Sequence, residues 1–78
     1  MNTKSNALRS KMESLIAGIA GTSVEIAILG NGKIYLSIVM DGNQATACDR
    51  LQKFFGPKFD SWEYDNELDA TYAGINLE

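Results

Sequence analysis

Two apolar stretches on either side of a glycine-rich turn, within residues 23–40, constrain the fold of this chain more than any other feature. Apolar side chains recur at every second position in both stretches, as they do on one face of a β-strand. The intervening GNG, residues 30–32, is typical of a hairpin loop. The sequence therefore predicts an antiparallel hairpin with one apolar face, formed by Val24, Ile26, Ile28, Ile34, Leu36, Ile38 and Met40.

The register of this hairpin depends on the length of its loop. The dipeptide Asn31-Gly32 favours a two-residue loop, but that loop would pair Ile28 with Tyr35 and mix the two faces. A three-residue loop, residues 30–32, pairs Ile28 with Ile34 and keeps the apolar side chains together. We therefore predict the pairs Ile28–Ile34, Ile26–Leu36 and Val24–Ile38, with Gly32 in the left-handed conformation.

Helical spacing of apolar residues precedes and follows the hairpin. The first helix is predicted to begin after Ser5 or Asn6 and to end at Gly21, with Gly18 packed closely on the sheet. The second is predicted to be capped from the turn at residues 41–43 and to end at Gly56-Pro57. The two apolar stripes are Leu8, Met12, Leu15, Ile16 and Ile19, and then Ala47, Cys48, Leu51, Phe54 and Phe55. The position of Cys48 on its stripe predicts a buried and inert thiol.

A second hairpin is predicted over residues 59–77, with its loop at residues 65–69, where Asp, Asn and Glu favour a turn. The element order is then α-β-β-α-β-β. We predict a single domain, residues 1–78, of the α+β class, with a four-stranded antiparallel sheet and two helices on one face.

Composition excludes several classes of function. The net charge of −3 and the pI near 4.7 argue against direct binding to nucleic acid, which requires a surplus of Lys and Arg. The single cysteine fits a reducing compartment, and no apolar run is long enough to span a bilayer, so we expect a cytoplasmic protein. The chain has no histidine and no catalytic motif, and we expect neither an enzyme nor a cofactor.

The alternating Asp65, Glu67 and Asp69 resemble the first ligands of a calcium-binding loop, but the pattern then fails. Ala70 stands where glycine is required, and Asn76 stands where a bidentate glutamate is required. We therefore predict no metal site at this loop.

The candidate site is a cluster of acidic and aromatic residues around the second hairpin. Five of the ten acidic residues lie between positions 60 and 69, and aromatic side chains are favoured anchors of protein interfaces. The alternative is a solvated hairpin tip, with Trp62 in the core. The predicted partner-binding residues are Asp60, Glu63, Asp65, Glu67, Asp69, Trp62, Tyr72 and Tyr35.

In its size, its acidic charge and its 60–69 cluster, the chain resembles the small phage-encoded inhibitors of bacterial immunity, such as anti-CRISPR proteins. This is a resemblance of type, without a shared motif. It implies an inhibitor that binds a host protein and blocks its basic nucleic-acid-binding surface. The alternative class is a structural or regulatory homodimer that associates through the half-apolar second face of the first hairpin, around Ala27, Leu29, Tyr35 and Val39.

Overall fold

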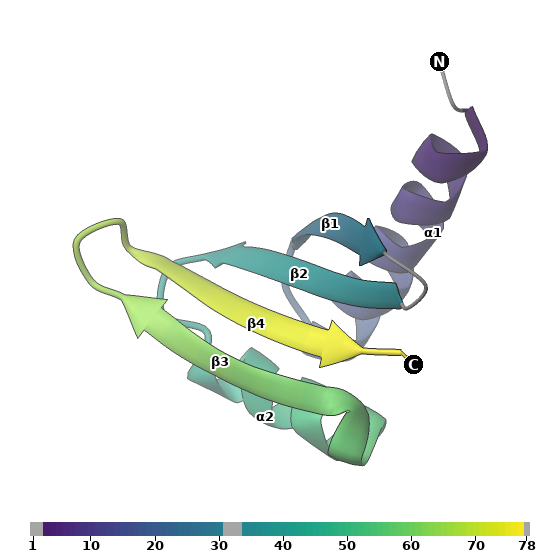
Figure 1. Ribbon diagram of the computed structural model, residues 1–78. Coiled ribbons are helices and arrows are strands. Elements are labelled where there is room, and N and C mark those ends of the chain that lie inside the picture. Colours follow the sequence, from purple (N-terminus) through teal and green to yellow (C-terminus); the bar gives the residue numbers. More distant parts are fainter. Residues whose placement is uncertain (1–2, 31–33, 78) are drawn as a thin grey trace.

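The computed structural model describes residues 3–30 and 34–77 of the chain (Figure 1). The order of elements is the predicted α-β-β-α-β-β, with one short 3₁₀ turn before the second hairpin. The elements are α1 (Thr3–Ala20), β1 (Glu25–Gly30), β2 (Ile34–Asp41), α2 (Ala45–Phe55), η1 (Gly56–Lys58), β3 (Phe59–Asp65) and β4 (Ala70–Asn76).

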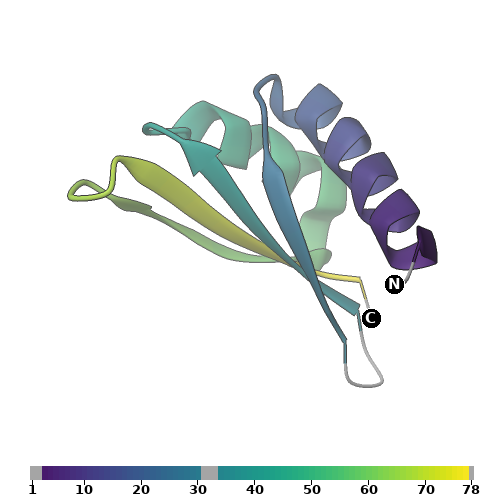
Figure 2. The same cartoon turned by 90° about the horizontal axis from the view of Figure 1, so that it is seen from above.

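The four strands form one antiparallel sheet in the order β1-β2-β4-β3. Both helices lie against the same face of this sheet, α1 near β1 and α2 near β3 and β4 (Figure 2). The fold is therefore the predicted two-layer α+β architecture, and no described helix covers the other face of the sheet. Neither of the described helices is long and apolar enough to cross a membrane.

The register of the first hairpin differs from our prediction by two residues. Ile28 pairs with Leu36 and Ile26 with Ile38, and Gly30 belongs to β1, where it pairs with Ile34. The predicted pairs Ile28–Ile34, Ile26–Leu36 and Val24–Ile38 are therefore wrong. A shift by two keeps the same residues on each face, so the predicted apolar face survives. The predicted conformation of Gly32 lies outside the described residues.

The core fills the space between the helices and the apolar sheet face. Its members from the strands are Ile26, Leu36, Ile38, Met40, Phe59, Ala73 and Ile75, and those from the helices are Ile16, Ala20, Ala47, Cys48 and Leu51. Cys48 is a free, buried cysteine as predicted, and burial raises the pKa of its thiol to about 11.

The predicted helical stripes are only partly correct. Leu8 and Leu15 on α1 are 45% and 50% exposed, and Phe54 on α2 is 62% exposed. Phe54 stacks edge-on against its neighbour Phe55, which packs on the core. Each helix touches the sheet along a line narrower than its apolar stripe, because each covers only part of a small sheet.

Two local predictions about the helices are wrong. α1 already begins at Thr3, so residues 5 and 6 lie within the helix. Gly18 is exposed, and a Cβ atom placed there would meet nothing within 4 Å, so it does not pack on the sheet. The predicted cap of α2 from the 41–43 turn is present: Gln44 makes no side-chain cap bond, but Oδ1 of Asn43 accepts the backbone N–H of Ala45 at 3.3 Å. The predicted ends of both helices are confirmed, because Gly21 after α1 and Gly56 after α2 have positive φ, at 79° and 60°.

The start of α2 is also fixed by Thr71, a fully buried residue of β4. Its hydroxyl donates to the carbonyl oxygen of Gly42 at 2.6 Å and accepts from the backbone N–H of Gln44 at 2.9 Å. The N–H of Gly42 in turn donates to the carbonyl oxygen of Asp69 at 2.8 Å. These bonds attach the β2–α2 turn to the end of the second hairpin.

Candidate functional site: the open face of the sheet

The face of the sheet opposite the helices is called the open face here, and its composition follows from the strand register. Residues that pair across an antiparallel sheet share a face, and successive residues alternate. Two rows that cross the sheet define its centre, namely Ala27, Ser37, Gly74 and Ser61, and beside it Glu25, Val39, Tyr72 and Glu63. Leu29 pairs with Tyr35 in a third row at one end of the strands. Asp41 and Asp65 lie in a fourth row at the opposite end.

Every charged residue in the described strands is acidic. The strand sequences contain five carboxylates and no lysine or arginine. Register alternation places four of them on the open face, and a hydrogen bond brings the fifth, Asp60, to the same side. The helices and η1 contain six basic and two acidic residues. The two layers therefore carry opposite charge. The strand carboxylates are Glu25, Asp41, Asp60, Glu63 and Asp65.

Tyr35 spans the middle of the open face. Its side chain extends from β2 across β4, and its hydroxyl donates to Oδ2 of Asp60 on β3 at 3.0 Å. A β-bulge between Phe59 and Ser61 interrupts the pairing at this point. The ring lies over Gly74, since a Cβ atom there would stand 2.6 Å from Cζ of Tyr35. Partial burial and the hydrogen bond to the Asp60 carboxylate both raise the pKa of Tyr35.

The tip of the second hairpin uses two of its carboxylates to hold its own shape. Oδ1 of Asp65 accepts the backbone N–H groups of Glu67 and Leu68 at 2.9 and 3.2 Å. Oδ1 of Asp69, which has a φ of 50°, accepts the hydroxyl of Tyr64 at 2.6 Å, and this bond raises the pKa of Tyr64. The acidic cluster predicted from sequence is therefore part turn and part surface.

The structure divides the predicted aromatic residues between the two faces. Tyr35 and Tyr72 are half-buried on the open face, where the exposed Glu63 also lies. Trp62 pairs with Ala73, whose side chain belongs to the core, so Trp62 lies on the helix side of the sheet. It stands on the edge strand β3 and is 39% exposed, so the alternative that placed it in the core is wrong.

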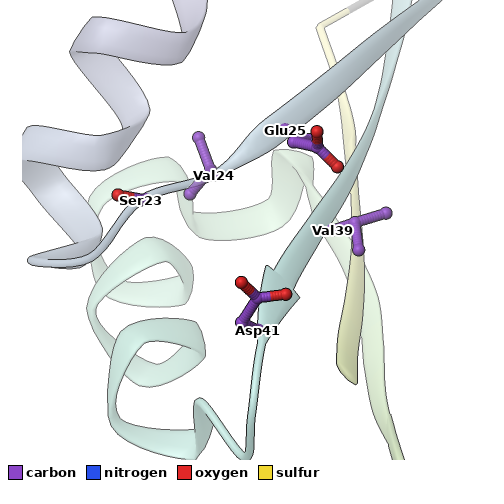
Figure 3. Close-up of a pocket in the computed structure, with 5 residues that line it drawn as sticks. All are labelled: Ser23, Val24, Glu25, Val39 and Asp41. Atoms are coloured by element: carbon purple, nitrogen blue, oxygen red, sulfur yellow. The ribbon is translucent and has the colours of Figure 1, made fainter. Parts of the chain in front are cut away.

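Three shallow hollows run across the open face. One of about 290 Å³ lies at the end of the first hairpin, where Glu25, Val39 and Asp41 project from β1 and β2 (Figure 3). A second, of about 480 Å³, shares Glu25 and Val39 and extends to Arg9 and Glu13 on α1. A third, of about 200 Å³, shares Ser37 with the second and reaches Tyr72 and Glu63. Because they share lining residues, the three hollows lie next to one another in a row from the β1 edge to β3, and this row is called the trough.

The β1 edge of this trough is closed by α1. Oε2 of Glu13 accepts the backbone N–H of Ile26 at 3.0 Å, which occupies a donor on the free side of the edge strand. Arg9, one helical turn earlier, lines the same hollow and is the only described cation found there. The trough therefore has a basic and an acidic residue, Arg9 and Glu13, at its β1 edge and Glu63 at its β3 edge.

Sequence clustering found Glu63 and missed Glu25 and Asp41, which lie far from it along the chain. The signal for Glu25 was its alternation with Ile26 in the first hairpin, which places it on the same face as Tyr35. The open faces of the two hairpins are brought together only by the pairing of β2 with β4. Nothing in the sequence indicates that pairing. Comparison of the chain with protein-family models, with curated proteins and with solved structures found no match.

The described side chains do not assemble a metal site. No group of three Cys, Asp or Glu residues among them is placed to hold an ion. The one ion pair among them, Lys53 Nζ to Asp49 Oδ2 at 3.2 Å, lies on α2 and is solvated. In the described part of the protein no basic side chain forms an ion pair with an open-face carboxylate, and Arg9 is the basic residue that lines a hollow with one of them, Glu25.

Proposed function

We propose that the protein is a non-catalytic binding module that docks its open face on a basic surface of another protein. The observation that carries the proposal is the segregation of charge: all charged strand residues are acidic and lie on the uncovered face. Clustered charge of one sign speeds the encounter with a surface of the opposite sign. Tyr72, Val39 and Leu29 supply the apolar contact area that such an interface also requires.

A partner whose basic surface ordinarily binds nucleic acid would be blocked by this contact. That mode of inhibition is the one implied by the resemblance to anti-CRISPR proteins, and the acidic open face is consistent with it. A homodimer through the same face is disfavoured by the charge. Two copies placed face to face would bring their carboxylates together without a lysine or arginine from either set of described strands.

The test is a titration of the ¹⁵N-labelled protein with a hexalysine amide, followed by chemical-shift changes. We expect shifts on the open face and an affinity that falls as salt rises, because exposed charges are screened within ~8 Å at physiological ionic strength. The double variant Glu25→Gln with Glu63→Gln should bind several-fold more weakly. Its matched control, Asp49→Asn with Glu67→Gln, removes the same charge elsewhere and should bind like the unmodified protein.

Shifts confined to the 65–69 tip or to the helices would contradict the proposal, as would equal losses in both double variants. Asp65 and Asp69 are left unchanged in this test because their carboxylates hold the hairpin turn. Sedimentation at micromolar concentration is a further check. A dimer that the open-face substitutions dissociate would favour the homodimer instead.

A further inference from the structure

The hollow lined by Tyr35 and Tyr72 is shallow and open, and it lies beside the edge strand β3. Its floor is a row of small residues that pair across three strands, namely Ser37, Gly74 and Ser61. The Tyr35 ring lies over Gly74 in this row, Tyr72 lines the hollow from the neighbouring row, and the volume of the hollow is about 200 Å³. Because the Tyr35 hydroxyl is bonded to Asp60, its ring is held in place before any partner arrives.

A carboxylate stands beside each ring. Glu63 pairs directly with Tyr72, and directly paired residues have Cβ atoms about 4.5–5.5 Å apart. Asp60 accepts the hydrogen bond of the Tyr35 hydroxyl and remains exposed, but it lies outside the residues that line the hollow, so Glu63 is the carboxylate of the hollow itself. A cationic group that enters the hollow therefore meets an aromatic face and a negative charge together.

We propose that this hollow receives an arginine side chain of the basic partner. The inference rests on the proposed function and adds the residue type that the open face recognises. A guanidinium is planar, stacks on aromatic faces and can form two parallel hydrogen bonds with one carboxylate. A lysine ammonium is a compact, strongly hydrated charge that uses the carboxylate but gains less from the ring.

The hollow at Glu25 and Asp41 provides a contrast within the same face. It has two carboxylates and the aliphatic Val39, but its lining residues include no aromatic ring (Figure 3). It attracts lysine and arginine alike through charge. Discrimination between the two cations is therefore assigned to the hollow at Tyr72.

The test compares hexa-arginine and hexalysine amides, two probes of equal charge and length, in chemical-shift titrations at one ionic strength. We expect the unmodified protein to bind hexa-arginine about three- to fivefold more tightly, the size of an exposed cation–π contact. Tyr72→Leu should reduce this ratio to about one and leave the hexalysine affinity unchanged. Ser61→Leu, which fills the hollow and leaves both rings, should do the same. Phe54→Leu, which removes an exposed aromatic ring from α2 on the other side of the sheet, should keep the preference.

The outcomes separate the two proposals. Equal binding of both peptides to the open face, or a preference that survives both Tyr72→Leu and Ser61→Leu, would overturn the arginine site and leave the acidic docking face standing. Failure of both peptides to bind the open face would overturn the docking face itself and the arginine site with it.

Discussion

Replacement of Gly74 by alanine tests the packing at the centre of the open face. The ring of Tyr35 lies where the new methyl group would stand, 2.6 Å from Cζ, and the ring must move. Movement breaks the hydrogen bond to Asp60. The backbone of Gly74 does not itself oppose the change, because its φ lies outside the positive range. The substitution therefore sets a side-chain clash against a favourable backbone effect.

The two effects can be given magnitudes. Loss of an exposed hydrogen bond costs about 1 kcal/mol. If roughly 40 Å² of ring surface loses its cover, another ~1 kcal/mol is lost. Alanine in a strand interior is better than glycine by about 0.5–1 kcal/mol. Gly74→Ala should therefore lower the free energy of unfolding by about 1–1.5 kcal/mol.

In a Tyr35→Ala background there is no ring to displace, and only the favourable backbone effect remains. Gly74→Ala should then raise the free energy of unfolding by about 0.5–1 kcal/mol, so the sign of the effect reverses. The coupling between the two positions is expected to be about 2 kcal/mol, within the range for residues in contact. Urea denaturation of the four proteins measures it. A coupling below ~0.5 kcal/mol would refute the packing of Tyr35 on Gly74.

Two further expectations concern the core. Leu51→Ala should lower the free energy of unfolding by about 2–5 kcal/mol, because Leu51 is 0% exposed. Phe54→Ala should lower it by less than about 1 kcal/mol, because Phe54 is 62% exposed, and similar urea midpoints for the two variants would contradict the observed phase of α2. Burial raises the pKa of the Cys48 thiol to about 11, whereas the unfolded thiol titrates near 8.5, so between pH 9 and 11 the unfolded state releases a proton that the native state keeps. Stability should therefore fall as pH rises through this range, by up to ~1.4 kcal/mol per pH unit, and the fall should be shallower in Cys48→Ala; parallel pH profiles would place the thiol in water.

The sequence predicted the architecture because each element carries its own signal. Alternation in the first hairpin, helical spacing on both sides and the acidic turn at residues 65–69 each have a local cause. Register was harder, because a shift by two residues keeps the same faces and leaves the pattern satisfied. Gly30 joins β1 instead of the loop, which sequence alternation alone does not reveal.

The prediction of which helix residues are buried was wrong for a different reason. An apolar stripe predicts which side of a helix turns inward but not how far the sheet extends beneath it. Leu8, Leu15 and Phe54 obey the helical period and remain exposed, because the four strands are too narrow to cover them. Trp62 fails likewise: its strand is an edge, where a residue on the core side still reaches solvent.

The candidate site could be predicted only in part, because it is assembled by the pairing of β2 with β4. That contact joins Tyr35 and Val39 of one hairpin to Tyr72 and Gly74 of the other. The sequence shows the acidic residues clustered at positions 60–69 but does not indicate that Asp41 lies on the same face. It also assigns to the surface two carboxylates that in fact hold a turn, those of Asp65 and Asp69.

The separation of charge between the layers has a cost that the fold does not require. Carboxylates gathered on one face repel each other, and mixing both signs over a surface would relieve that repulsion. The chain contains enough lysine and arginine to do so, but in the described elements all of it lies on the helices and η1. Strand formation does not explain this, because Lys and Glu are both disfavoured in strands. An acidic face whose described strands carry two tyrosines and no cation therefore does not follow from stability alone, and it is the arrangement that the proposed basic partner would require.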